Sequence, residues 1–461
     1  MTKLSKAGVI IALVILAGMF FIPGAGRLDQ AGIRTMGLLL AFLVVLFTEA
    51  LPMMLTCLIS LVLMPVLRIT PNFSSALTGF SNPVVFFILA SFGIAAAFTT
   101  IPLSKRLLVA LLKVFGKNVK SMLFALMMCT AIISSVVSNV PTCAIFMAIS
   151  LSFLELYTDP AAKKKAGRAF MIGIPVASMV GGMMTPAGSS NNLLVITLLE
   201  QYTGKTITFV QWMAAGLPLS LVLLPIAWQL IYVAYKPAEI EPETVKKFIA
   251  KLDIPPKISL VEIKTLVITG IMLALWILSS WFRQINVMVV ALAGACVFCL
   301  PGIKALRFKT LLENIRWESF FLVGTVLSLG SAMVSNKVSD WLISLLPAMS
   351  FPAPLLIAVI ASVTFAMLIV VPVAPSLITF MSLPFITLAA GMGFSPVSAM
   401  LAFGLCVANC YLLPLDTVPQ LTYGTGYYSM TDMIKSTLPL QICIVIIVSL
   451  WIPLIGGILG L

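Results

Sequence analysis

The chain has 461 residues, of which 61% are hydrophobic and 9% are charged. Soluble globular domains are about a quarter charged, so this balance excludes an ordinary soluble protein. The 28 Lys and Arg residues outnumber the 15 Asp and Glu residues, and there is no histidine. Because the basic residues fall mostly in short loops between apolar runs, we attribute the positive charge to membrane orientation rather than to nucleic-acid binding.

The sequence also argues against an enzyme and against a cofactor. The eight cysteines are scattered through apolar segments without a CxxC pair, and no histidine is available to complete a metal site. No paired carboxylates share one depth, so general acid–base chemistry has no obvious machinery. A channel would carry currents far above the turnover of a transporter.

The apolar runs predict an all-α polytopic membrane protein. Continuously apolar segments of about 20 residues favour helices over a β-barrel, whose strands alternate. The predicted segments are residues 9–24, 33–49, 51–67, 83–101, 122–157, 170–199, 209–235, 266–282, 287–300, 320–334, 353–391, 397–423 and 436–459.

Four of these segments are unusual. Residues 122–157 and 353–391 would exceed 50 Å as single helices, against an apolar bilayer core of about 30 Å. Each has polar or helix-breaking residues near its middle, so we predict two re-entrant hairpins. Residues 170–199 and 397–423 are single crossings interrupted by MTPAGSSNN and LPLDTVPQ. Irregular backbone at membrane depth is tolerated where it is buried in protein or lines a cavity.

Lys and Arg residues test this topology, because they prefer the cytoplasmic side. Basic clusters flank residues 122–157 on both sides, from Lys105 to Lys120 and from Lys163 to Arg168. Both are cytoplasmic only if the segment between them returns to its own side. With the basic loop from Lys304 to Arg316 also inside, we predict about eleven crossings plus two hairpins, an N-terminus in the cytoplasm and a C-terminus outside.

The two halves of the chain repeat one another. PVVFFILASFGIAAAF from Pro83 resembles SFFLVGTVLSLGSAM from Ser319, and each precedes a hairpin segment and an interrupted helix. The pairing matches Ser138 with Ala374 and Gly188 with Asp416. The predicted topology makes this an inverted repeat, which together with broken helices is typical of secondary transporters.

Each break is predicted to begin a new half-helix with a polar residue near its start. Such helix starts offer free N–H groups and a partial positive charge, and two aimed at one point form an anion site. The alternative is that the breaks are packing kinks. The predicted capping residues are Ser138 and Asn139 in the first hairpin, Ser189 to Asn191 in the first broken helix, Pro375 and Ser376 in the second hairpin, and Asp416 and Thr417 in the second broken helix.

On these features the whole chain resembles the divalent anion/sodium symporter family, whose members carry di- and tricarboxylates or sulfate. TEALP at 48–52 and FSNPVV at 80–85 match the family. The first Ser-Asn-Thr hairpin tip is here Ser138-Asn139-Val140, and the Gly-Thr-Pro-Pro-Asn break is residues 188–192. The resemblance implies a homodimeric elevator transporter in the cell membrane, in which a transport domain slides past a scaffold domain and Na⁺ is the coupling ion.

The resemblance also implies the site residues. The first sodium site would use Ser134, Ser138, Asn139 and Gly188. The expected substrate-binding residues are Ser138, Asn139, Val140, Thr142, Ser189 and Asn192 in the first half, and Ser376, Thr379 and Thr417 in the second.

The second half departs from the family pattern. Ala374-Pro375-Ser376 replaces Ser-Asn-Thr, and Val370 stands one turn earlier. Asp416 takes the place of a small residue, and an ionisable group at membrane depth is a functional hypothesis by default. We expect Asp416 to hold or carry the second coupling cation, Na⁺ or H⁺; alternatively, it only caps its half-helix.

The sequence therefore predicts a cation-coupled transporter of small anions such as di- or tricarboxylates. The alternatives are a Na⁺-independent anion exchanger, a proton-coupled transporter using Asp416, and a carrier of sulfate-type inorganic anions. The expected parts are scaffold helices in residues 1–82, a transport-domain half in 83–207, connecting and scaffold helices in 208–316 with a cytoplasmic linker at 236–262, a second transport-domain half in 317–435, and a last helix in 436–461.

Overall fold

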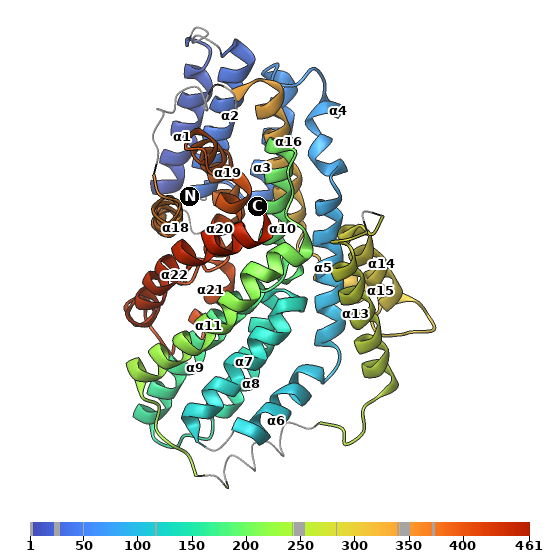
Figure 1. The fold of residues 1–461 in the computed structure, drawn as a ribbon, viewed down its shortest axis with the longest axis vertical. Coiled ribbons are helices and arrows are strands. Elements are labelled where there is room, and N and C mark those ends of the chain that lie inside the picture. The colour runs from blue at the N-terminus through green and yellow to red at the C-terminus, as the bar shows by residue number, and fades with distance from the viewer. Residues whose placement is uncertain are drawn as a thin grey trace.

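The computed structural model describes residues 3–22, 28–48, 50–115, 118–241, 243, 254–282, 284–338, 341, 351–370 and 374–461. Parts of the predicted cytoplasmic linker and the turn of the second hairpin, residues 371–373, lie outside these ranges. The described residues form helices without a β-strand, which confirms the all-α prediction (Figure 1).

The first half contains α1 (Lys3–Gly18), α2 (Gln30–Phe47), α3 (Met53–Val66), α4 (Phe73–Ala76), η1 (Thr78–Ser81), α5 (Pro83–Thr99), α6 (Leu103–Phe115), α7 (Val119–Val137), α8 (Asn139–Leu154), α9 (Pro160–Gly182), η2 (Pro186–Gly188), α10 (Ser190–Thr203) and α11 (Phe209–Tyr235). The second half contains α13 (Leu260–Leu278), α14 (Val287–Cys299), α15 (Phe308–Asn314), α16 (Trp317–Ser335), α18 (Ala353–Val370), α19 (Ala374–Gly391), α20 (Pro396–Val407), α21 (Thr417–Tyr423) and α22 (Met430–Leu459).

The apolar helices fit a multi-pass membrane protein. Among the described residues, 6 helices are long and apolar enough to cross a bilayer, or 7 if the bent pair α5–α6 is one span. Shorter apolar helices include α2, α3, α8, α14, α18 and α20. The crossing number and the re-entry of the hairpins stay predictions, since helix length alone does not decide them.

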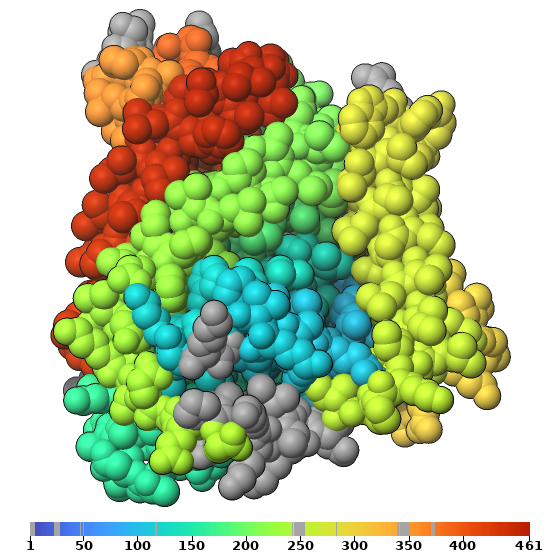
Figure 2. All heavy atoms as spheres, turned by 60° about the horizontal axis from the view of Figure 1, so that its bottom comes forward, coloured from blue at the N-terminus to red at the C-terminus, as the bar shows by residue number. Residues whose placement is uncertain are grey.

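The internal repeat is visible in the order and the packing of the helices. A single helix (α5 or α16) precedes a helix pair (α7–α8 or α18–α19), a broken helix (α9–α10 or α20–α21) and a long last helix (α11 or α22). The half-helix α10 packs against α19 and α20, and α21 packs against α8 and α9 in the reciprocal arrangement. The long helices α11 and α22 run side by side, as Figure 2 shows in green and red.

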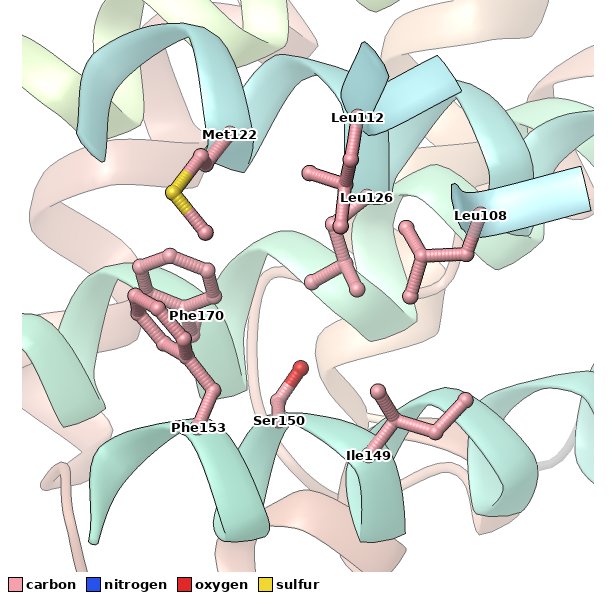
Figure 3. Close-up of a pocket in the computed structure, with 8 residues that line it drawn as sticks. All are labelled: Leu108, Leu112, Met122, Leu126, Ile149, Ser150, Phe153 and Phe170. Carbon is pink, nitrogen blue, oxygen red and sulfur yellow. The ribbon is translucent and has the colours of Figure 1, made fainter. Parts of the chain in front are cut away.

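The first long segment folds back on itself as a helical hairpin. Only Ser138 separates α7 from α8. Met122 and Leu126 at the start of α7 line the same small apolar pocket as Ile149 and Phe153 at the end of α8 (Figure 3). The two outer ends of the segment therefore lie together, as the basic clusters on both sides of the segment require.

The short helix α6 connects α5 to this hairpin and is fixed by a buried ion pair. α5 and α6 meet at a bend of 62°. Arg106 Nε donates to Glu262 Oε2 at 2.5 Å, and Arg106 Nη2 donates to the Lys257 carbonyl at 2.7 Å. The Glu262 side chain is only 1% exposed, so the guanidinium neutralises a carboxylate that water does not reach.

We predict that Arg106→Gln lowers the melting temperature in detergent by roughly 5 °C or more, because it leaves a buried carboxylate without its cation. The matched control is Lys309→Gln, which breaks the exposed pair between Lys309 and Glu313 at 4.0 Å. Its expected effect is under about 1 °C. Equal shifts for the two variants would show that the Arg106 pair does not anchor α6.

Candidate functional site

All four predicted breaks contribute to one cavity of about 250 Å³. The first hairpin supplies the residues at its turn, and the half-helices α10 and α21 supply their first residues. The lining residues from the breaks are Ser138, Asn139, Val140, Ser189, Ser190, Asn191, Ala374, Pro375, Val407, Ala408, Cys410, Leu415, Asp416, Thr417, Val418 and Gln420. The convergence of segments so far apart in sequence makes this cavity the candidate site.

Ser138 makes the turn of the first hairpin in the left-handed region, with φ 87°. A non-glycine residue in this region is strained and is retained where its surroundings fix it. The expectation that its hydroxyl caps α8 is wrong, because its side chain makes no cap hydrogen bond. The backbone turn alone starts the new helix, and the hydroxyl is left for other partners at the cavity.

Three side chains behind this turn form a compact oxygen cluster. Ser134 Oγ donates to Asn139 Oδ1 at 2.8 Å and lies 3.1 Å from Ser178 Oγ. Ser178 Oγ donates to the Asn139 carbonyl at 2.8 Å. Ser134 and Ser178 are fully buried, so these hydroxyl and amide oxygens meet in a place shielded from water. Hard oxygen ligands of this kind suit an alkali cation.

The first broken helix fits against this cluster through glycines. A Cβ on Gly182 would lie 1.9 Å from Asn139 Oδ1, so only glycine lets the Asn139 amide take its position. A Cβ on Gly188 would lie 2.5 Å from the Gly182 carbonyl and 3.0 Å from the Ser135 carbonyl. Gly188 is therefore close to the hairpin, although it does not line the cavity.

At the break between α9 and α10, side chains form hydrogen bonds with backbone N–H and C=O groups. Thr185 Oγ1 accepts from Gly188 N at 3.0 Å and donates to the Ser135 carbonyl at 2.6 Å. Ser189 caps α10 by accepting from Asn191 N at 3.3 Å. Asn192 Nδ2 donates to the carbonyls of Gly182 and Thr185 at 2.8 and 2.9 Å.

Asp416 caps the second half-helix in the same way. Its Oδ1 accepts from Val418 N at 3.1 Å, and Gln420 Nε2 donates to the Leu415 carbonyl at 2.7 Å. Asp416 thus corresponds to Ser189, the cap of α10, rather than to Gly188 as the repeat alignment suggested. The carboxylate both caps α21 and lines the cavity, so its capping role does not exclude contact with a bound ion.

Four of the predicted substrate residues do not line the cavity. Thr142 Oγ1 donates to the Ser138 carbonyl and Thr379 Oγ1 to the Pro375 carbonyl, each at 2.8 Å. Asn192 faces the break, as described above. Ser376 is fully buried with no hydrogen-bond partner for its hydroxyl, and Asn192 Oδ1 is also without one. Thr142, Thr379 and Asn192 therefore hold the backbone around the cavity, whereas the Ser376 hydroxyl and Asn192 Oδ1 have no hydrogen-bond partner among the described residues.

The second hairpin presents little polarity to the cavity. Its lining residues are Ala374 and Pro375, which have no polar side-chain atoms. The side chain of Val370 and residues 371–373 lie outside the described part of the chain. The expected asymmetry between the two halves is therefore present in the described lining.

The cavity lining also contains residues that sequence reasoning missed. Arg316, Glu318 and Ser319, at the start of α16, line the cavity. Arg316 and Glu318 are exposed, and sequence alone placed this stretch among the cytoplasmic loop charges. The available signal was their position directly before an apolar span that repeats α5. In the part of the lining that the structure describes, Arg316, Glu318 and Asp416 carry the charges, one positive and two negative.

The sequence matches a known family of membrane proteins and several of its curated members. The family model described as sodium:sulfate symporter transmembrane region matches residues 3–461. The sodium-dependent dicarboxylate transporter SdcS of Staphylococcus aureus is 26% identical over 476 residues, covering 97% of this chain and 90% of that protein. An uncharacterized transporter of Haemophilus influenzae is 25% identical over 443 residues, covering 89% and 90%.

Two solved structures share the fold at low identity. MtrF of Neisseria gonorrhoeae, described with a class of antimetabolite efflux pumps, has a TM-score of 0.61 at 12% identity and covers 99% of this chain and 94% of its own. The YdaH transporter of Alcanivorax borkumensis has a TM-score of 0.56 at 13% identity, covering 100% and 98%. Because the family model spans nearly the entire chain, the protein belongs to the sodium:sulfate symporter family of membrane transporters, which confirms the family predicted from sequence.

Proposed function

We propose that this protein is a Na⁺-coupled transporter of small dianions, with dicarboxylates as the substrate class. The observation that carries the proposal is the meeting of Ser138–Asn139, Ser189–Asn191 and Asp416–Thr417 at one cavity. The dicarboxylate class is supported by the similarity to SdcS. The polar groups at the cavity are hydroxyls, amides and helix starts, which suit a cation and an anion together.

The first Na⁺ site is proposed at the first hairpin, with Ser134, Ser138, Asn139 and Gly188 as its ligands. The buried oxygen cluster of Ser134, Asn139 and Ser178 supports this site. The backbone of Gly182 at the break lies directly against the same amide, since a Cβ there would meet Asn139 Oδ1 at 1.9 Å. A cation there would hold Asn139 in place and so organise the start of α8.

The anion is proposed to bind in front of this cation. α8 and α10 both begin at the cavity, and their free N–H groups and partial positive charges favour an anion. Ser138, Asn139, Val140, Ser189 and Thr417 are the proposed substrate-facing residues, and all five line the cavity. Thr142, Asn192 and Thr379 are proposed to act from behind it by fixing the backbone, and Ser376 is a proposed ligand of the second cation.

The charges of the lining favour coupling to cations. The described lining carries one positive charge and two negative charges, so it does not by itself attract a dianion. Bound Na⁺ would reverse this balance, and a second cation is proposed in the second half of the site, where the Ser376 hydroxyl has no hydrogen-bond partner among the described residues. Asp416 is the proposed partner of that second cation, Na⁺ or H⁺.

The proposed transport mechanism is an elevator movement. The two hairpins and broken helices pack on one another, whereas α3, α5, α14 and α16 form a neighbouring group. In this proposal α5 and α16 therefore belong to the scaffold, although the sequence predicted them within the transport-domain halves at 83–207 and 317–435. Sliding of the first group past the second would expose the cavity to either side in turn. A homodimer, a cytoplasmic N-terminus and an external C-terminus complete the proposal.

Uptake by proteoliposomes tests the proposed function. With labelled succinate outside, an inward Na⁺ gradient should accelerate uptake at least about tenfold over an equal K⁺ gradient. Uptake that needs internal succinate but not Na⁺ would identify an exchanger, and uptake driven by an inward proton gradient alone would identify proton coupling. Competition by sulfate but not by other dicarboxylates would identify a sulfate-type carrier.

We predict that Gly182→Ala lowers Na⁺-driven uptake at least about tenfold, because its Cβ would displace the Asn139 amide. The control is Gly457→Ala on α22, where a Cβ would meet no atom within 4 Å. Both variants should purify as folded protein. Full uptake by Gly182→Ala, with an unchanged Na⁺ requirement, would show that Asn139 is not part of the proposed Na⁺ site.

We predict that Asp416→Asn changes the Na⁺ or pH dependence of uptake while α21 stays capped, since Asn is as good an N-cap as Asp. Asp416→Ser, which introduces the residue that caps α10, should behave in the same way. The measurements are initial rates against Na⁺ concentration and against pH. If both variants keep the wild-type ion dependence, Asp416 is only a helix cap.

A further inference from the structure

Arg316 is the single positively charged residue in the described lining of the cavity. Its side chain is exposed, and it makes no hydrogen bond or ion pair with another described side chain. The opposite charges of Asp416 and Glu318 line the same cavity. A guanidinium in a cavity lining that is not held in an ion pair can donate hydrogen bonds to a ligand.

Arg316 belongs to a different element from the oxygen cluster of the first hairpin. It immediately precedes α16, which packs against α3 and η1 and also against α10 and α19, whereas the hairpin packs against α9. Because Arg316 and the turn at Ser138 line the same cavity, an anion held at the start of α8 can also meet the Arg316 guanidinium. The proposed substrate can be contacted from two directions.

Among the described residues of the second hairpin, Ala374 and Pro375 line the cavity, and neither offers a competing polar side-chain group. The remaining polar residues on that side are Asp416, Thr417 and Gln420 of the second broken helix. Asp416 is negative and repels a carboxylate unless a cation is bound. A second carboxylate of the substrate thus has one strongly favourable partner in the described lining, the Arg316 guanidinium, which can donate two parallel hydrogen bonds.

We propose that Arg316 binds the second negative charge of the substrate and so makes the site selective for dianions over monoanions. This inference rests on the proposed function and names the residue that determines the preference between dianionic and monoanionic substrates. Arg316 replaces the polar hairpin tip that the second half lacks. A monoanion of the same size would use only the first hairpin, and the guanidinium would give it little additional affinity.

Matched ligands test this role. Succinate and monomethyl succinate have the same four-carbon chain but carry two charges and one. Their dissociation constants are measured in Na⁺ buffer by calorimetry, using the full-length protein in detergent as wild type, Arg316→Gln and Arg316→Lys. The control variant is Arg307→Gln, which removes a nearby basic residue that does not line the cavity.

In the wild type, succinate should bind at least about tenfold more tightly than monomethyl succinate. Arg316→Gln should weaken succinate about tenfold or more and monomethyl succinate by less than about twofold, removing the preference. Arg316→Lys should keep part of the preference for succinate, because the positive charge remains but the two parallel hydrogen bonds of a guanidinium are lost. Arg307→Gln should match the wild type.

Wild-type discrimination that persists unchanged in Arg316→Gln overturns the inference and leaves the proposed function standing. Equal weakening of both ligands also overturns it, because that result assigns Arg316 a structural role. A wild-type protein that binds neither succinate nor sulfate in Na⁺ overturns the proposed function together with the inference. Because Arg316 is exposed, its substitution should leave the protein folded. A melting curve for each variant checks this.

Discussion

Backbone N–H and C=O groups inside a bilayer must find partners within the protein, because lipid offers none. Each helix break at that depth therefore needs side chains or glycine contacts that satisfy it. Here Thr185, Asn192 and Asp416 satisfy the two broken helices, and the strained turn at Ser138 starts α8 without a side-chain cap. The same groups that the breaks require are the groups that a cation and an anion can bind.

The two halves of the chain place different polar groups at their helix breaks. The first half gathers serine, asparagine and glycine into a buried oxygen cluster that fits a cation. The second half presents Ala374 and Pro375 at the cavity and adds a carboxylate at Asp416. Arg316 and Glu318 bring further charge from α16, outside either hairpin. The shared fold thus supports a site whose polarity is unequal at its two ends, which is a basis for selectivity by charge.

The sequence was sufficient for features that follow from local chemistry. Apolar length predicted the helices, the polar breaks predicted the cavity residues at Ser138, Ser189 and Asp416, and the basic clusters predicted the returning first hairpin. It was insufficient where the outcome depends on packing between distant segments. From sequence, Arg316 was assigned to a charged loop, and only the structure places it in the cavity lining. Nor did the sequence indicate that the hydroxyls of Thr142 and Thr379 donate to backbone carbonyls. Likewise, the observed first residues of α10 and α21 were needed to see that Asp416 and Ser189 cap their helices in the same way.

The central claim is that one site binds Na⁺ and a dianion together, so that each stabilises the binding of the other. Melting temperatures of the purified protein, with Na⁺ or K⁺ and with or without succinate or sulfate, test this claim most directly. The account predicts that the dianion raises the melting temperature in Na⁺ and has little effect in K⁺. A rise of the same size in both cations, or no rise with either anion, would contradict it.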